Sequence, residues 1–186
     1  MRAHVASLLS VAVLTLGVGQ AQAASHGSYA ITPAEVEQAQ QAWGDALLAI
    51  SQAYRDGGRD SAAAKASAVL DAAYGYAQGP VLFKPTLAHG EQTFRTTQDG
   101  ALAYFVGGNS DFPDDSGFAL KDWHGFAFEN AAVHLHGDLA LTMGHVMLTN
   151  TEDEVTTVDK TWGFQRDDQG DLRIVLHHSS LPFSAD

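Results

Sequence analysis

Two histidine and serine pairs end the last predicted strand of this chain and are its foremost candidates for chemistry. Residues 172–183 read Leu-Arg-Ile-Val-Leu-His-His-Ser-Ser-Leu-Pro-Phe. Neighbouring side chains on a strand point to opposite faces, so His177 shares a face with Ser179, and His178 shares the other with Ser180. An imidazole exchanges protons near neutral pH, and a hydroxyl both donates and accepts hydrogen bonds. The pattern predicts either one such pair inside a pocket at the mouth of a sheet, or a polar strand end that frays into solvent.

A histidine metal site is an alternative. His134 and His136 are two residues apart and share one face of a predicted strand, a spacing that can chelate zinc. His145, on the strand that returns after a Gly-Asp turn, is expected opposite Asn130, several residues from that pair. The two adjacent histidines of the tail cannot both point at one ion from a regular strand. A serine hydrolase is disfavoured because no G-x-S-x-G elbow surrounds the tail serines.

Two helices are predicted before the strands. Residues 32–35, Thr-Pro-Ala-Glu, combine an N-cap, a proline at the first helical position and a glutamate at the third, which together form a capping box. Apolar residues then recur at helical spacing until Gly57-Gly58 ends the pattern. Asp60-Ser61 opens a second, alanine-rich helix that extends to Tyr74.

Strand-like periodicity follows from Val81 to the last residues. Asp99-Gly100 predicts a hairpin between 92–97 and 101–106. The other predicted strands cover residues 81–86, 123–136, 139–149, 154–166 and the tail up to Pro182. These elements predict an α+β fold in which two N-terminal helices pack on a strongly curved, mostly antiparallel sheet of about six strands. Such a sheet encloses a conical cavity, which is the default position for a site.

Composition bounds the class of protein. The chain has 186 residues, no cysteine, 45% hydrophobic residues and a formal net charge of -12, so we expect one acidic domain over 33–183 that does not bind nucleic acid. Residues 1–23 have the basic start, apolar run and Ala-Gln-Ala end of a secretory signal peptide, and 24–32 form a flexible leader. No later stretch is long enough to span a membrane. We expect a periplasmic or secreted protein.

Several segments together resemble the iota-class carbonic anhydrases, which lie in the larger group similar to the association domain of calcium/calmodulin-dependent protein kinase II. The resemblance extends over about 33–183, and the His-His-Ser-Ser tail is its most specific mark. In one departure, Leu176 stands where the family tail often has a first histidine, which weakens a metal site built on the tail. The matching segments are 81–86, 103–108, 117–120, 128–130 and 176–182.

The resemblance implies a cone-shaped, nuclear-transport-factor-2-like fold, a homodimer, and reversible hydration of carbon dioxide to bicarbonate. Some members of the class hold bicarbonate without a metal by a threonine, a tyrosine and a serine, which match Thr86, Tyr104 and Ser179. Three hydroxyls suit the three oxygens of bicarbonate. Two of them also have a plain structural explanation: Tyr104 as a core tyrosine, and Thr86 as a hydroxyl that caps a bulge.

Proton transfer is the harder part of such a reaction. Bound zinc lowers the pKa of water from about 15.7 to about 7, so a metal-free site needs a concerted attack of water in which a base takes the proton. We nominate His177 as that base or as a proton relay, and its alternative role is to orient Ser179. We expect no cofactor. A zinc-dependent enzyme using His134 and His136, and a non-catalytic ligand-binding or oligomerisation module, are the competing hypotheses.

Overall fold

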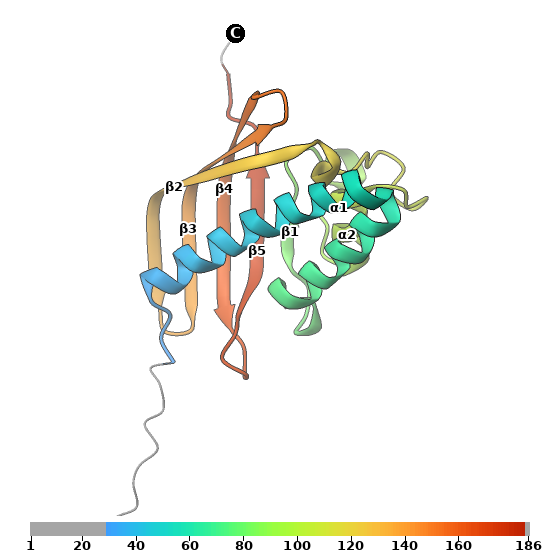
Figure 1. Cartoon of the computed structure of the whole chain (residues 1–186). Coiled ribbons are helices and arrows are strands. Elements are labelled where there is room, and N and C mark those ends of the chain that lie inside the picture. Colours follow the sequence, from blue (N-terminus) through green and yellow to red (C-terminus); the bar gives the residue numbers. More distant parts are fainter. Residues whose placement is uncertain (1–28, 185–186) are drawn as a thin grey trace, which may run out of the picture.

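A long, bent helix forms the first part of the fold. The computed structural model describes residues 29–184. Helix α1 (Pro33–Ala73) crosses one face of the sheet and then folds back (Figure 1). At Gly58, φ of 71° and ψ of -166° interrupt the helical geometry, so α1 consists of two helical arms, as predicted. Glycine adopts this backbone conformation without the clash that a Cβ causes. Thr32 and Glu35 form the predicted capping box at the start of α1.

The sheet has five strands where about six were expected, in the order β1-β5-β4-β3-β2. Its neighbours are antiparallel except for β1 and β5, which are parallel. Because β5 is paired on both sides, the hypothesis that the tail frays into solvent is wrong. The strands are β1 (Leu82–Lys84), β2 (Trp123–His136), β3 (Leu139–Asn150), β4 (Val155–Arg166) and β5 (Leu172–Ser180).

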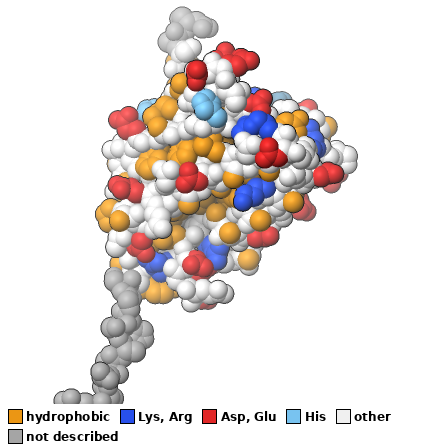
Figure 2. Space-filling view, viewed as in Figure 1, with side chains coloured by type: hydrophobic (Ala, Val, Ile, Leu, Met, Phe, Trp, Pro, Cys, Tyr) orange, Lys and Arg blue, Asp and Glu red, His pale blue; other side chains and the backbone are white. Residues whose placement is uncertain are grey.

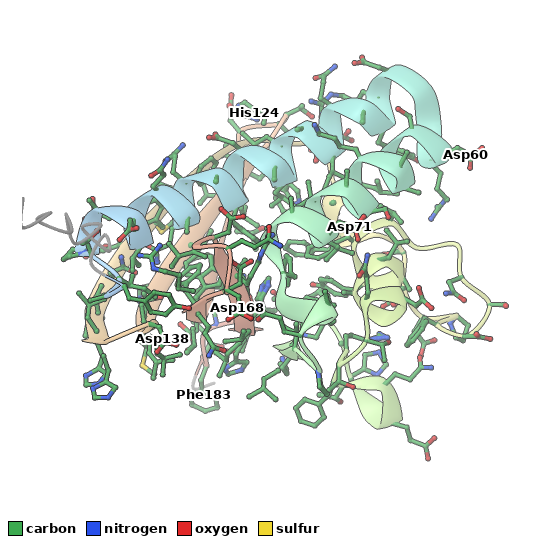
Figure 3. The ribbon with its side chains drawn as sticks, turned by 90° about the horizontal axis from the view of Figure 1, so that it is seen from below. Asp60, Asp71, His124, Asp138, Asp168 and Phe183 are labelled. Carbon is green, nitrogen blue, oxygen red and sulfur yellow. The ribbon has the colours of Figure 1, made fainter. Side chains whose placement is uncertain are left out.

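The core lies between α1 and the concave face of the sheet. Strand β2 bends so that its first part runs across one end of the sheet (Figure 1), and its pairing with β3 shifts twice along its length. Such bulges increase the local bend and twist of a strand. Side chains from α1 and the sheet fill the enclosed space (Figure 3). Its most buried members include Val36 and Leu70 of α1, Leu148 of β3, and Trp162 and Phe164 of β4.

The hairpin predicted over 92–106 is wrong. Residues 98–106 form helix α2 (Gln98–Val106) and no strand covers 92–97. The Thr97 side chain caps α2 by accepting from the Gly100 backbone N–H at 3.3 Å, so Asp99-Gly100 belongs to a first helical turn. A short run that is buried on all sides does not distinguish helix from strand by periodicity. The described part of the chain also contains three short 3₁₀ helices: Gly75–Ala77, Gly90–Gln92 and Phe118–Leu120.

The histidines of β2 and β3 lie on the outside of the protein. His136 pairs with Leu139, as the predicted turn requires, but His145 pairs with Glu129 and not with Asn130, because a bulge between Asn130 and Ala132 shifts the register by one residue. His134 and His136 are exposed. Within residues 29–184, no group of three or more His, Asp or Glu side chains is arranged to hold a metal ion.

The start of the described chain is attached to the sheet. The predicted signal peptide, 1–23, and the leader up to residue 28 lie outside the described residues. The last leader residues contact the domain: Ile31 N–H donates to the Gly137 carbonyl at 2.8 Å, and Arg166 Nε donates to the Tyr29 carbonyl at 3.1 Å. Acidic side chains are scattered over the face that carries α1 (Figure 2). No helix of residues 29–184 is long and apolar enough to cross a membrane.

Candidate active site

One small cavity brings together all four residues that the sequence analysis singled out. Thr86, Tyr104, His177 and Ser179 line it, although only the last two lie on a strand. Thr86 follows the end of β1 and Tyr104 lies on α2, so the predicted strands 81–86 and 101–106 do not carry these two residues into the site. The cavity is small, with about 10 Å³ open to the centre of a water molecule. Its other walls are Trp43, Phe105, Phe118, Leu148, Val158 and Lys160.

The alternation predicted for the tail decides which His/Ser pair enters this cavity. His177 and Ser179 are each 2% exposed and face the core, whereas His178 is exposed and Ser180 is half-buried. Strand β5 carries the pair in because it lies inside the sheet, between β1 and β4. The Lys84 ammonium of β1 also donates to the Ser179 carbonyl at 3.0 Å, which ties the end of β5 to its neighbour.

Both ring nitrogens of His177 already have partners in the protein. Nδ1 lies 2.8 Å from the Tyr74 hydroxyl, which in turn accepts from Trp43 Nε1 at 3.0 Å. Nε2 is in hydrogen-bond contact with Lys160 Nζ. The ring packs on Phe83 with centroids 4.3 Å apart. Burial first, and then the proximity of the basic groups Lys160 and His178, hold the pKa of His177 well below its usual 6.5.

Lys160 is the functional candidate that our sequence analysis missed. It lies on β4, is 3% exposed, and its Nζ contacts His177 Nε2 and donates to Ser179 Oγ at 3.0 Å. The same nitrogen lies 4.2 Å from the centroid of Trp43. Burial holds the pKa of Lys160 well below its usual 10.5. A signal was present in the sequence, because Lys160 stands between Val158 and Trp162 on the apolar face of an alternating strand.

Tyr104 presents a hydroxyl without a hydrogen-bond partner in the described part of the chain. Its ring is 5% exposed and packs between Phe83 and Phe118, with centroids 5.7 and 5.4 Å away. Burial raises the pKa of Tyr104 far above 10, and the nearby Thr86 hydroxyl and backbone offset part of that rise. Tyr104 therefore stays protonated at neutral pH and has a proton to donate to a ligand oxygen.

The fold and then the family follow from comparison with known proteins. A helix packed in a curled sheet is the nuclear-transport-factor-2-like arrangement. The crystal structure of a putative calcium/calmodulin-dependent protein kinase II association domain from Xanthomonas campestris shares this fold. It has a TM-score of 0.51 and 20% identity, over 82% of this chain and 92% of that one.

The family is narrower than the fold. The family model described as metal-independent carbonic anhydrase matches residues 34–181. A metal-independent carbonic anhydrase from Nostoc sp. (strain PCC 7120 / SAG 25.82 / UTEX 2576) is 57% identical over 154 residues, which are 83% of this chain and 75% of that protein. An iota-carbonic anhydrase from a cyanobacterium, crystallised with bicarbonate, matches with a TM-score of 0.84 and 56% identity over 85% of this chain and 96% of that one. The chain belongs to the family of metal-independent carbonic anhydrases.

Proposed function

We propose that this protein is a carbonic anhydrase that interconverts carbon dioxide and bicarbonate in the cavity lined by Thr86, Tyr104 and Ser179, without a metal. The observation that carries the proposal is the meeting of these three hydroxyls in one buried cavity, in a chain that belongs to this family. The structure of the cyanobacterial relative with bicarbonate supports the same substrate class.

The hydroxyls supply what a metal-free reaction needs. Without a metal, forming hydroxide outright would require about nine pKa units, roughly 12 kcal/mol. A concerted attack of water on carbon dioxide avoids that intermediate if donors meet the negative charge as it develops. Tyr104 suits this role because no other group of residues 29–184 accepts its proton in a hydrogen bond. Thr86, half-buried beside it, supplies a second hydroxyl.

Ser179 is suited to hold the attacking water. Its Oγ accepts from Lys160, which leaves its own O–H proton for another partner. His177 acts as a relay or positioning residue in this proposal, because its two nitrogens are engaged by Tyr74 and Lys160. The exposed His134 and His136 do not line the cavity, and we assign them no role in the reaction.

Hydration by metal-free protein tests the proposal. We expect stopped-flow assays to show carbon dioxide hydration after exhaustive chelation, with elemental analysis of the same sample showing no stoichiometric metal. The matched control is the chelated protein with zinc restored, which should be no faster. Activity that appears only with zinc would contradict the metal-free mechanism. If neither sample is active, the protein is not a carbonic anhydrase, and the hypothesis of a ligand-binding or oligomerisation module remains.

We also propose that the protein is a homodimer in the periplasm or outside the cell. Apolar side chains exposed on the outer face of β3, Leu141 and Met143 at 38% and 63%, suit burial against a second copy. The signal-peptide pattern of 1–23 supports export. Light scattering should give twice the mass of the chain, and N-terminal sequencing of the exported protein should begin near residue 24. A monomer, or an intact N-terminus, would contradict the respective proposal.

A further inference from the structure

We infer that Lys160 is the proton acceptor of the hydration reaction. Its side chain is a neutral amine before substrate binds, and it becomes an ammonium ion when it takes the proton. The ammonium ion then holds the bicarbonate product. This inference rests on the proposed function and extends it to a residue of β4 that touches the other side of Ser179. The same lysine would then serve as base in hydration and as acid in dehydration.

The surroundings of Lys160 favour the neutral amine when the cavity is empty. An ammonium ion buried without an anion loses its hydration and receives nothing equivalent in return. Within residues 29–184, no carboxylate lies within ion-pair distance of Nζ. The ring of Trp43 offers only a weak attraction to a cation. Burial accordingly lowers the pKa of Lys160.

The titratable groups around Lys160 provide no counter-charge either. Asp115, a buried carboxylate whose charge acts on Tyr104, is paired with Arg95 at 3.0 Å. Asp159, the neighbour of Lys160 on β4, points to the outer face, where it meets His145 at 3.3 Å. The remaining groups are neutral or cationic at neutral pH: His177 and His178 of β5, Lys84 of β1, Tyr74 at the end of α1 and Tyr104 of α2. An anion in the cavity would therefore be the first counter-ion that Lys160 meets.

The proton passes from the attacking water to Lys160 by way of the Ser179 hydroxyl. The water oxygen forms a bond to the carbon of carbon dioxide, and one C–O π pair moves to the developing carboxylate oxygen. In the reacting arrangement the hydrogen bond between Lys160 and Ser179 is reversed: the Ser179 O–H donates to the lone pair of the neutral amine, whose Nζ lies 3.0 Å from Oγ, and the water donates to Ser179 Oγ. A water proton then passes to Ser179 Oγ while the Ser179 proton passes to Lys160 Nζ. The products are bicarbonate and the Lys160 ammonium ion. The cavity has no net charge before or after the step, so no isolated charge is buried.

Bicarbonate binding should therefore take up one proton. We would titrate the chelated protein with sodium bicarbonate at constant ionic strength between pH 7 and 9, following the fluorescence of Trp43 and Trp162, whose rings lie 4.2 and 5.0 Å from Nζ. For the unaltered protein, the dissociation constant should rise toward tenfold per pH unit above the pKa of the free amine. Hydration rates are measured on the same samples.

Two variants of Lys160 separate charge from proton transfer. Lys160→Arg carries a permanent charge, so we expect bicarbonate binding that no longer changes with pH, and a hydration rate lowered at least 100-fold. Lys160→Gln keeps a polar side chain without an amine and should lose both the pH dependence and the rate. The control is Lys65→Gln, the same change at an exposed lysine of α1, which should behave like the unaltered protein. Circular dichroism checks that each variant is folded.

The outcomes distinguish this inference from the proposed function. If the unaltered protein hydrates carbon dioxide and Lys160→Gln does so equally well, Lys160 is not the acceptor and the proposed function stands. The inference is also overturned if the dissociation constant of bicarbonate for the unaltered protein does not change between pH 7 and 9. A ¹³C carbamate signal on Lys160 would overturn it too, because the amine would then act as a nucleophile. If the unaltered protein does not hydrate carbon dioxide at all, the proposed function itself fails.

Discussion

The tyrosines around the cavity differ in whether their hydroxyls have hydrogen-bond partners in the protein. The Tyr74 hydroxyl contacts both Trp43 Nε1 and His177 Nδ1, whereas the equally buried Tyr104 hydroxyl has no hydrogen-bond partner among residues 29–184. Buried hydroxyls in proteins are nearly always paired. An unpaired one that faces a cavity is therefore the group expected to bind a ligand.

Removal of the Tyr104 hydroxyl should separate activity from stability. Within residues 29–184 the Tyr104 hydroxyl makes no hydrogen bond of normal geometry, so we expect Tyr104→Phe to leave the free energy of unfolding in urea nearly unchanged. Hydration should fall about 100-fold or more, the usual loss of one donor to a developing anion. Stopped-flow assays and urea titrations on one preparation test both expectations.

Tyr76→Phe is the matched control. The Tyr76 hydroxyl donates to the Arg95 carbonyl at 3.1 Å, outside the cavity lining. Its loss should lower stability by about 1 kcal/mol and leave the hydration rate unchanged. Full activity in Tyr104→Phe would assign Tyr104 to the core alone.

At the scale of elements, the geometry at the end of α2 positions Tyr104. The helix ends at Gly107, whose φ of 61° and ψ of -166° are close to the 71° and -166° of Gly58 in α1. The two sites differ in their surroundings. A Cβ at Gly107 would lie 2.6 Å from Arg59 Nη1 and 2.7 Å from the Asp115 carbonyl, whereas a Cβ at Gly58 meets nothing within 4 Å.

These two glycines form a natural pair of variants. Gly107→Ala combines backbone strain with a clash, and we expect it to lower the free energy of unfolding by about 3 kcal/mol. Gly58→Ala adds the strain alone and should lower it by about 1 kcal/mol. Only Gly107→Ala should also reduce hydration, because it displaces α2 and with it Tyr104. Equal losses of stability in the two variants would show that the close contacts at Gly107 relax freely.

At the scale of the whole molecule, one ion pair joins the start of α1 to the sheet. Arg166, at the end of β4, donates to Glu35 at 2.7 Å, and Glu35 also belongs to the capping box. The Arg166 contact first, and then the hydrogen bonds from Thr32, lower the pKa of Glu35 from 4.5 to about 2. Because the folded state binds this proton more weakly than the unfolded chain does, the stabilisation is complete above pH 4.5 and is lost as pH falls toward 2.

Glu35→Gln should make the acid unfolding of the protein less steep. We expect the variant to lose less stability than the unaltered protein between pH 4.5 and 2, as measured by urea titrations at fixed pH. Glu37→Gln, at an exposed position two residues further along the same turn, is the control and should keep the original slope. Identical slopes for all three proteins would mean that the Arg166 contact does not persist in solution.

Local patterns in the sequence determined much of this protein. The capping box at Thr32, the break near Gly58 and the turn between β2 and β3 depend on neighbouring residues only, and all three were predictable. Strand alternation likewise placed His177 and Ser179 on one face. The residues that match the iota-class family, together with these patterns, were enough to propose the reaction.

The tertiary structure alone decided which groups meet. Residues 98–106 form a helix that the sequence pattern did not predict, because a short apolar run that is buried on all sides shows no periodicity that separates helix from strand. Lys160 reaches Ser179 because β4 and β5 pair in a register that sets them opposite each other. Such contacts join residues far apart in the chain. Alternation along one strand predicts to which face a side chain points. The partner of that side chain, its burial and hence its pKa depend on the elements that pack against the strand.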